Sequence, residues 1–369
     1  MKVYIDDQIF FMQRRGGISR YFVEMMLAFR ANPAIGVTIT GLPVDRSNLH
    51  LKDAGLGRRV PRGFGRFRSR AVTLMQDQSW KYPIPDVVHH TQYYDPNYLQ
   101  RHKNVAKRVV TVYDMIPEIH PELFPHGNPH GFKQEFVAAA DLVICISEVT
   151  KQHLMWIYGT PANKIVVIPL GVDMSVFKPD EEPHEGLPSR YVLFVGQRGG
   201  YKDFSTLARA FALADLPQEI KLVAVGGGNF TATEHSELHE IGISQRTVHL
   251  NLGDAELAGA YGNADCFVFP STIEGFGLPT LEAMASGCPT ILADIDTHRE
   301  VGAAAAGYFA PRDSGELAQL LVDLTSNQEL RLRMRREGLS RAASFTWNET
   351  AWKTGLAYAD VLGRRRRDR

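Results

Sequence analysis

Short runs rich in Val and Ile recur along this chain, and stretches with helical periodicity separate them. That alternation is typical of parallel strands that are buried on both faces and joined by crossover helices. It constrains the fold more than any other feature and predicts an α/β protein. We expect strands at 2–6, 36–42, 86–91, 108–114, 141–147, 164–171, 191–196, 221–227, 248–253, 265–271 and 289–295, with helices at 18–30 and 148–158.

The segment "GVDMSVFKPDEEPHEGLPS" (171–189) interrupts the alternation with Pro, Gly and acidic residues, and the pattern then restarts. A chain of 369 residues is long enough for two domains. We therefore predict two doubly wound domains, at 1–172 and 173–345, followed by a helical segment with a basic tail at 346–369. Loops at the carboxyl ends of the strands would line the ligand site, in a cleft where the two loop sets face each other.

Composition limits the partners and the compartment. Forty-one basic residues balance forty-one acidic ones, so net charge gives no indication of a nucleic-acid partner. Cys145, Cys266 and Cys288 are widely spaced within apolar runs, so we expect buried thiols without a disulfide or a zinc site. No signal-peptide pattern or membrane-spanning run is visible, which favours a cytoplasmic protein at most resting on a membrane.

A glycine turn follows the first strand of each predicted domain. Gly16 and Gly17 precede the helix at 18–30, where backbone N–H groups could bind a phosphate and Arg20 could add charge; an ordinary turn with a solvated Arg20 is the alternative. In "QRGGYKDF", Arg198 and Lys202 could hold a diphosphate, although loop cations are usually solvated.

A triple glycine, "VAVGGGNF" (223–230), ends another predicted strand. A nicotinamide-binding G-x-G-x-x-G motif would need glycine where Thr231 stands, which argues against a dehydrogenase. We interpret it as a tight turn and leave open whether its backbone approaches a nucleotide.

The stretch "FPSTIEGFGLPTLEAMASGCPTI" (269–291) carries the most specific signal. A strand, a glycine turn and a helix beginning near Pro279 would present the amides of residues 276–278 to an anion. Glu274 in the turn could accept hydrogen bonds from sugar hydroxyls, and Glu282, one turn into the helix, could hold a ribose diol. The alternative is that Glu282 lies on a polar helix face.

The segment "LAGAYGNADCFVFPSTIEGFGLPTLEAMASGCPTI" resembles the signature of retaining family 4 glycosyltransferases, with Glu274 and Glu282 as its two spaced glutamates. The resemblance covers nearly the whole chain, through "GGISRY", "VIPLGVD", "VGQRGGYKD" and "FTWNETAW". It implies the GT-B architecture: two facing Rossmann-like domains, an acceptor domain first and a donor domain second, with a C-terminal helix that returns to the first.

The resemblance also implies residue roles. Glu282 would bind the donor ribose, Glu274 with the amides of Phe276, Gly277 and Leu278 would hold the transferred sugar, and Arg198 with Lys202 would hold the diphosphate. Many relatives carry a histidine where this chain has Tyr113, followed by Asp114. We assign no catalytic histidine there; Tyr113 could contact sugar, and Asp114 could position the acceptor or stabilise developing positive charge.

His89 and His90 end the preceding strand, and we expect one in the core and the other near substrate. For the reaction, the resemblance implies same-face displacement, in which the departing phosphate takes the acceptor proton, rather than a covalent carboxylate intermediate. No metal or cofactor is then needed beyond the nucleotide sugar. Asp294 and Asp296 have D-x-D spacing but are interpreted as a loop away from the diphosphate site.

The chain has two basic clusters, at 57–70 and 363–369. Segments of this kind are usually solvated. Phe64 and Phe67 among the arginines of 58–70, together with the tail 364–369, suggest contact with anionic lipid headgroups.

The sequence therefore predicts a metal-independent retaining transferase of a hexose or deoxyhexose onto a growing, lipid-linked glycan. "GGISRY", "YDMIPE" and "RGGYK" look most like O-antigen mannosyl- or rhamnosyltransferases, which favours a GDP-sugar donor. Two alternatives stay open: a sugar-nucleotide epimerase or hydrolase, which would turn over without an acceptor, and a non-catalytic sugar-nucleotide-binding subunit.

Overall fold

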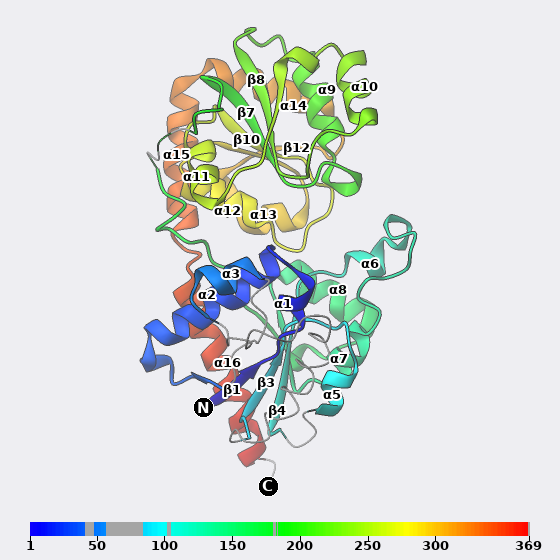
Figure 1. Ribbon diagram of the computed structural model, residues 1–369, viewed down its shortest axis with the longest axis vertical. Helices are drawn as coiled ribbons and strands as arrows, with labels where there is room; N and C mark the ends of the chain where they lie inside the picture. Colours follow the sequence, from blue (N-terminus) through cyan, green and yellow to red (C-terminus); the bar gives the residue numbers. More distant parts are fainter. Residues whose placement is uncertain (41–47, 57–83, 102–104, 180–181, 183, 368–369) are drawn as a thin grey trace, which may run out of the picture. The chain divides into compact units, whose positions relative to one another are not determined.

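The computed structural model describes residues 1–40, 48–56, 84–101, 105–179, 182 and 184–367, with side chains omitted at 101 and 364–367. The chain divides into two compact units (Figure 1). The first contains Met1–Gly171 together with Trp347–Arg369, and the second contains Val172–Thr346. The C-terminal segment therefore belongs to the same unit as the N-terminus.

The first unit is a parallel sheet in the order β2-β1-β3-β4-β5-β6, covered by helices. Its strands are β1 (Lys2–Ile5), β2 (Thr38–Ile39), β3 (Val87–His90), β4 (Lys107–Val112), β5 (Leu142–Cys145) and β6 (Ile165–Val167). Its helices are α1 (Gln8–Met12), α2 (Gly17–Ala31), α3 (Leu49–Asp53), α5 (Asn97–Arg101), α6 (Ile116–Ile119), α7 (Lys133–Ala139), α8 (Glu148–Tyr158) and α16 (Trp347–Arg367).

The second unit is also a parallel sheet, in the order β12-β11-β10-β7-β8-β9. Its strands are β7 (Arg190–Val195), β8 (Ile220–Val225), β9 (Thr247–Leu250), β10 (Cys266–Phe269), β11 (Thr290–Ala293) and β12 (Gly307–Phe309). Its helices are α9 (Phe204–Leu213), α10 (Ala232–Glu240), α11 (Asp254–Gly262), α12 (Leu278–Ala285), α13 (Asp296–Gly302), α14 (Ser314–Ser326) and α15 (Gln328–Ala342).

The α/β class and the eleven predicted strands are confirmed, and the all-buried pattern of strands such as β3, β5, β10 and β11 agrees with a sheet covered on both faces. The short edge strand β12 was missed because three residues carry too little periodicity. The sequence also indicates helix throughout 313–343, but this segment forms two helices, since Asn327 has extended backbone angles and its side chain caps α15 by accepting from the amide of Leu330.

Each sheet reverses its strand order once, between β1 and β3 in the first unit and between β7 and β10 in the second. In open parallel sheets, ligands bind outside the carboxyl ends of the strands at such a switch point, because the flanking connections leave in opposite directions. The topology therefore indicates candidate ligand sites at the loops after β1 and β3 in the first unit, and at those after β7 and β10 in the second.

The returning helix α16 is fastened to the first sheet by buried polar contacts. It packs against α2. Nδ1 of His89 on β3 lies 2.5 Å from the hydroxyl of Tyr358, and Nε2 lies 2.8 Å from the hydroxyl of Thr111 on β4. His89 and Tyr358 are both fully buried. His89 is thus a core residue with both ring nitrogens engaged, and the hypothesis that it contacts substrate finds no support in its position.

We expect Tyr358→Phe to destabilise the protein by about 2 kcal/mol, because it leaves Nδ1 of His89 buried without its partner. Urea unfolding would measure the change. Tyr94→Phe is the matched control, since the Tyr94 ring is 65% exposed. Equal unfolding free energies for the two variants would contradict this account of the helix attachment.

His89 also predicts a pH dependence of stability. Burial lowers its pKa to about 3, so the folded protein keeps the ring neutral in mild acid. The unfolded chain binds this proton near pH 6.5, hence stability should fall as pH drops from about 6.5 towards 3, with a slope of up to about 1.4 kcal/mol per pH unit. Urea unfolding at several pH values would show this slope reduced by one proton in His89→Gln; an unchanged slope would refute the assignment.

Candidate active site

The turn between β10 and α12 forms an anion-binding backbone at the switch point of the second unit. Gly277 is the N-cap of α12 and has φ 98° and ψ 58°, a left-handed conformation that favours glycine. Pro279 lies in the first turn of the helix, where its missing N–H is not needed. Within the described residues, the N–H groups of Phe276 and Gly277 have no acceptor. These donors lie at the positive, N-terminal end of a helix and are available to an anion or a hydroxyl.

Glu274 and Lys202 meet at this turn although 72 residues separate them. Nζ of Lys202 lies 2.5 Å from Oε1 of Glu274, and the two side chains are 22% and 11% exposed. The ammonium also lies 5.4 Å from the centroid of the Phe269 ring at the end of β10. A backbone bond from Thr272 to the carbonyl of Tyr201 joins the two loops. The predicted sugar-binding and diphosphate-binding residues are therefore neighbours and neutralise each other in the unliganded protein.

Glu282 is buried rather than displayed on a polar helix face. It is 7% exposed on α12, and the hydroxyl of Tyr261 on α11 lies 3.5 Å from its Oε2. A carboxylate is costly to bury unless it is hydrogen-bonded. The alternative of a solvated glutamate is therefore excluded, while the ribose-binding role stays a prediction.

Arg198 is bonded to protein groups in this structure, and its predicted diphosphate-binding role stays a prediction. Its Nε donates to Glu234 at 2.7 Å, and its Nη atoms donate to the carbonyls of Gly226 and Asn229 at 2.8 and 3.0 Å. Its guanidinium also lies 4.5 Å from the Phe230 ring centroid. The side chain is 4% exposed. In the unliganded protein Arg198 thus fastens the loop after β8, and Lys202 carries the cationic role at the turn.

This clamp explains the triple glycine. Gly226, Gly227 and Gly228 all have φ between 72° and 83°, as a tight turn requires. A Cβ on Gly227 would lie 2.9 Å from Nη1 of Arg198, so a side chain there would displace the guanidinium. Burial by itself would raise the pKa of Glu234, but bonds from Arg198 and Thr231 lower it to about 2, which keeps the pair ionised.

Arg198→Gln should therefore destabilise the unliganded protein by roughly 3 kcal/mol, since it leaves Glu234 and the loop carbonyls without their buried cation. Arg209→Gln is the control, because Arg209 is exposed on α9. Denaturant unfolding would measure both variants. A stable Arg198→Gln protein that has lost only nucleotide affinity would instead support the original diphosphate role.

The start of α13 is part of this site, and the sequence analysis missed it. The hydroxyl of Thr297 donates to the carbonyl of Glu274 at 2.9 Å. His298 is fully buried and its ring centroid lies 5.1 Å from that of Phe269. The segment after β11 is therefore against the Glu274 turn rather than away from it, because β11 is paired with β10. Asp294 itself forms an exposed ion pair with Arg299.

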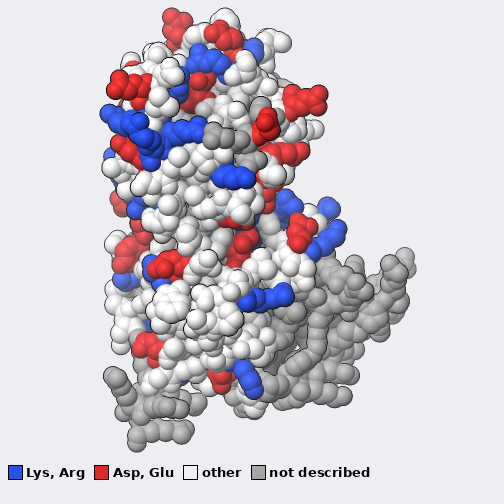
Figure 2. Space-filling model, turned by 90° about the vertical axis from the view of Figure 1, so that its left-hand side faces the viewer, with Lys and Arg blue, Asp and Glu red and all other residues white. Residues whose placement is uncertain are grey.

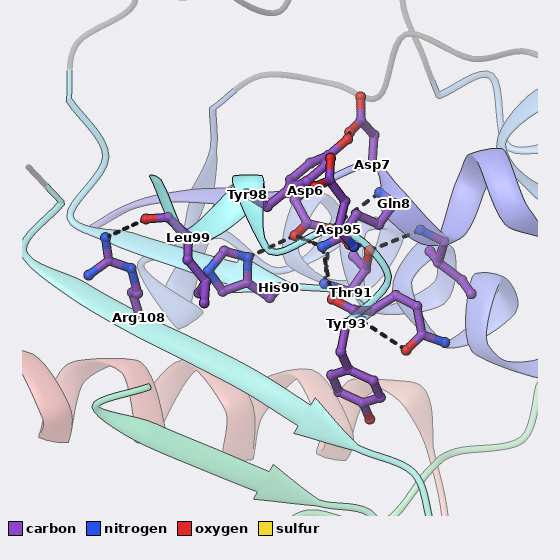
Figure 3. Close-up of polar contacts among 12 residues, drawn as sticks. Asp6, Asp7, Gln8, His90, Thr91, Tyr93, Asp95, Tyr98, Leu99 and Arg108 are labelled. Atoms are coloured by element: carbon purple, nitrogen blue, oxygen red, sulfur yellow. Dashed lines mark hydrogen bonds and ion pairs between the residues drawn. The ribbon is translucent and has the colours of Figure 1, made fainter. Parts of the chain in front are cut away.

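The switch point of the first unit is filled by its own side chains (Figure 3). Asp6, which follows β1, is fully buried and accepts from Nδ1 of His90, both donors of Thr91 and both donors of Gln8. Burial by itself would raise the pKa of Asp6, but His90, Thr91 and Gln8 together lower it. Gln8 also holds the loop after β3 by bonding to Gln92, Tyr94 and Asp95. His90 is thus a buried partner of a carboxylate.

Tyr113 and Asp114 have local partners at the end of β4. The Tyr113 hydroxyl donates to the carbonyl of Thr91 at 2.7 Å, and the side chain is buried. Oδ1 of Asp114 accepts from the amide of Ile116, the first residue of α6, while its side chain stays partly exposed. Asp114 keeps a surface that an acceptor could reach; the Tyr113 hydroxyl does not.

The glycine pair at the start of α2 is covered by a neighbouring side chain. Gly16 is the N-cap and Gly17 is the first helical residue. Oε1 of Gln13 accepts from the amide of Ser19 at 3.2 Å, so the carboxamide occupies part of the place that a phosphate would take. Arg20 is half-buried in the same turn. A phosphate site here stays a prediction that requires Gln13 to move.

Three further predictions concern metals, thiols and membrane contact. In the described residues, no group of three His, Cys, Asp or Glu side chains could hold a metal ion, and no helix is long and apolar enough to cross a membrane. Cys145, Cys266 and Cys288 are buried free thiols. The segment 58–70 and the side chains of 364–369 lie outside the described part, and the face in Figure 2 intersperses Lys and Arg with Asp and Glu.

Two family models match the chain in succession. The model of Glycosyltransferase Family 4 matches residues 15–176, and that of Glycosyl transferases group 1 matches residues 178–341, which contain the whole turn described above. The chain belongs to the group 1 and family 4 glycosyltransferases. The family assignment agrees with the predicted resemblance.

Individual relatives are distant. A D-inositol 3-phosphate glycosyltransferase from Xylanimonas cellulosilytica is 30% identical over 63% of this chain and 60% of the relative. O-antigen chain mannosyltransferase B from Escherichia coli is 27% identical over 72% of this chain and 73% of the relative. The chain thus spans less than two thirds of the length of the former.

Solved structures share the fold over almost the full length. HepE from Anabaena, solved with UDP and glucose, has a TM-score of 0.73 at 16% identity, covering 97% of this chain and 99% of that one. Sucrose-phosphate synthase from Thermosynechococcus elongatus has a TM-score of 0.74 at 18% identity, covering 98% and 99%. These glycosyltransferase neighbours confirm the predicted GT-B fold.

Proposed function

We propose that this glycosyltransferase is a retaining, metal-independent enzyme that transfers a hexose or deoxyhexose, of the mannose or rhamnose type, from a nucleotide diphosphate sugar. The observation that carries the proposal is the turn after β10, where free amides at a helix start adjoin Glu274, Lys202 and the buried Glu282. One end of this arrangement suits an anion and the other suits hydroxyl groups. A nucleotide diphosphate sugar combines both chemistries.

The unliganded ion pair suggests how the donor is held. In the proposed complex, Lys202 turns from Glu274 to the diphosphate. The carboxylate oxygens of Glu274 that Lys202 has left then accept hydrogen bonds from sugar hydroxyls. Glu282 receives the ribose diol, and the amides of Phe276, Gly277 and Leu278 hold the sugar. Because the charges are already paired in a partly buried place, donor binding exchanges one set of ionic contacts for another and exposes no isolated charge.

For the chemistry, we propose displacement on one face of the sugar. The bond from the anomeric carbon to the diphosphate oxygen breaks while the acceptor oxygen bonds to the same face, and the departing phosphate takes the acceptor's proton. Lys202 stabilises the negative charge that grows on the leaving group. Glu274 is disfavoured as a nucleophile, because in the proposed complex its carboxylate oxygens accept hydrogen bonds from sugar hydroxyls and its carbonyl is fixed by Thr297.

The acceptor is proposed to be a growing, lipid-linked surface glycan at the inner face of the cell membrane, with Asp114 as a residue of its site. A relative named as an O-antigen chain mannosyltransferase supports a surface glycan as acceptor and a mannose-type sugar, and a GDP-sugar is the donor we propose. The inositol phosphate acceptors named for other relatives, and the UDP bound by HepE, set the alternatives. The basic segments 58–70 and 364–369 are proposed to contact anionic headgroups.

The deciding measurement is calorimetric titration of the protein, in EDTA, with GDP, UDP, dTDP and ADP. We expect one nucleotide, preferably GDP, to bind at micromolar concentration and to lose about a hundredfold in affinity in Glu282→Ala, since charged hydrogen bonds to the ribose are removed. Glu240→Ala is the matched control, because Glu240 is exposed at the end of α10.

Binding that is indifferent to Glu282, or dependent on added metal, would refute the proposed donor site. Incubation of the matching nucleotide sugar without an acceptor separates the transferase from its rivals. A transferase leaves the donor sugar intact when no acceptor is present, whereas an epimerase or hydrolase converts it.

A further inference from the structure

The turn that holds the donor has two buried polar groups behind it that the proposed function does not use. Thr280 is the third residue of α12 and His298 is the third residue of α13, and both are fully buried. Within the described part of the chain, neither Oγ1 of Thr280 nor Nε2 of His298 has a hydrogen-bond partner. An unpartnered buried polar group is destabilising, so two at one place call for a physical reason.

The proton of the imidazole can be placed. Nδ1 of His298 lies 2.8 Å from the carbonyl of Ala293, and a carbonyl only accepts, so Nδ1 carries the proton. Burial lowers the pKa of His298, which keeps the ring neutral. Nε2 therefore presents a lone pair and needs a donor, and the hydroxyl of Thr280 can donate.

Both groups face Gly277. An atom placed at the Cβ position of Gly277 would lie 3.5 Å from Oγ1 of Thr280 and 3.9 Å from Cδ2 of His298, the ring atom next to Nε2. The same point is 3.4 Å from the Phe269 ring. The Cβ position of Gly277 is thus close both to the Thr280 hydroxyl and to the His298 ring, and no hydrogen bond joins Oγ1 of Thr280 to Nε2 of His298 in this structure.

The same part of α13 is already tied to the turn, because Thr297 bonds to the carbonyl of Glu274. A change in the turn on donor binding is therefore transmitted to α13 at its first residues. When Lys202 leaves Glu274 for a diphosphate, the segment Glu274–Gly277 loses its ionic restraint and can settle against the sugar.

We propose that Thr280 and His298 are positioning residues of the donor site, whose hydroxyl and Nε2 join in a hydrogen bond when the turn closes on the transferred sugar. The bond forms behind Gly277 and holds the amides of Phe276 and Gly277 in the sugar-bound geometry. Neither residue touches the substrate; both act through the turn. The inference rests on the proposed donor site and specifies how the sugar, as distinct from the nucleotide, is recognised.

The test is a double-mutant cycle in Thr280→Val and His298→Asn, in the full chain. Valine keeps the shape of threonine without its hydroxyl, and the asparagine amide can still donate to Ala293 but has no atom at Nε2. For each protein, calorimetry measures the dissociation constants of GDP and of GDP-mannose. The GDP value divided by the GDP-mannose value gives the contribution of the sugar to affinity. UDP with UDP-glucose, dTDP with dTDP-rhamnose, or ADP with ADP-glucose replaces this pair if that nucleotide binds instead.

We expect each single variant to lower the ratio about three- to tenfold, the effect of losing one hydrogen bond, and the double variant to lower it no further. Affinity for the nucleoside diphosphate should not change, and Thr280→Ser, which keeps the hydroxyl, should restore most of the ratio. Because the bond is absent without ligand, Thr280→Val should melt at or above the temperature of the unmodified protein.

Three results would overturn the proposal. Effects that multiply in the double variant would show that the two groups act separately. Weaker binding of the nucleoside diphosphate combined with a lower melting temperature would show a purely structural role. Absence of any Glu282-dependent nucleotide binding would remove the donor site itself, and that failure is recognised before the cycle begins.

Discussion

Parallel pairing of the strands is the constraint on which the rest of this structure depends. A parallel strand must be followed by a crossover to the opposite end of the sheet, so all loops after the strands gather at one edge. In the second unit the order reverses between β7 and β10, which brings Lys202 and Glu274 to the same place from loops 72 residues apart in sequence. No short-range preference could produce that pairing.

The two switch points use their polar residues in opposite ways. In the first unit, Asp6 receives bonds from Gln8, His90 and Thr91, so the groups at the strand ends satisfy one another. In the second unit, Lys202 and Glu274 form an ion pair that a competing anion can exchange. A satisfied buried network fixes loop geometry, whereas a partly exposed ion pair beside free amides can be replaced by a ligand. The proposed donor site accordingly lies in the second unit.

Burial distinguishes the two cations of the loop after β7. Arg198 and Lys202 stand four residues apart and are alike as sequence motifs, yet the guanidinium is almost fully buried against Glu234 and loop carbonyls. Arginine suits this position because its planar group can donate several bonds at once, while lysine is a compact cation on a flexible stem. The same loop therefore contains one structural cation and one that turns to the diphosphate in the proposed donor complex.

The sequence by itself determined the α/β class, the strands, the glycine turn and the family, because hydrophobic period and glycine placement act over a few residues. It also selected Glu274 and Lys202, which the structure brings into contact, and Glu282, whose ribose-binding role stays a prediction. Tertiary structure decided the rest: that His89 is a core residue holding α16, that Arg198 is a clamp, and that α13 lies against the donor turn. These assignments depend on which strands are adjacent and which groups share a buried space, and both follow from long-range packing that local patterns do not encode.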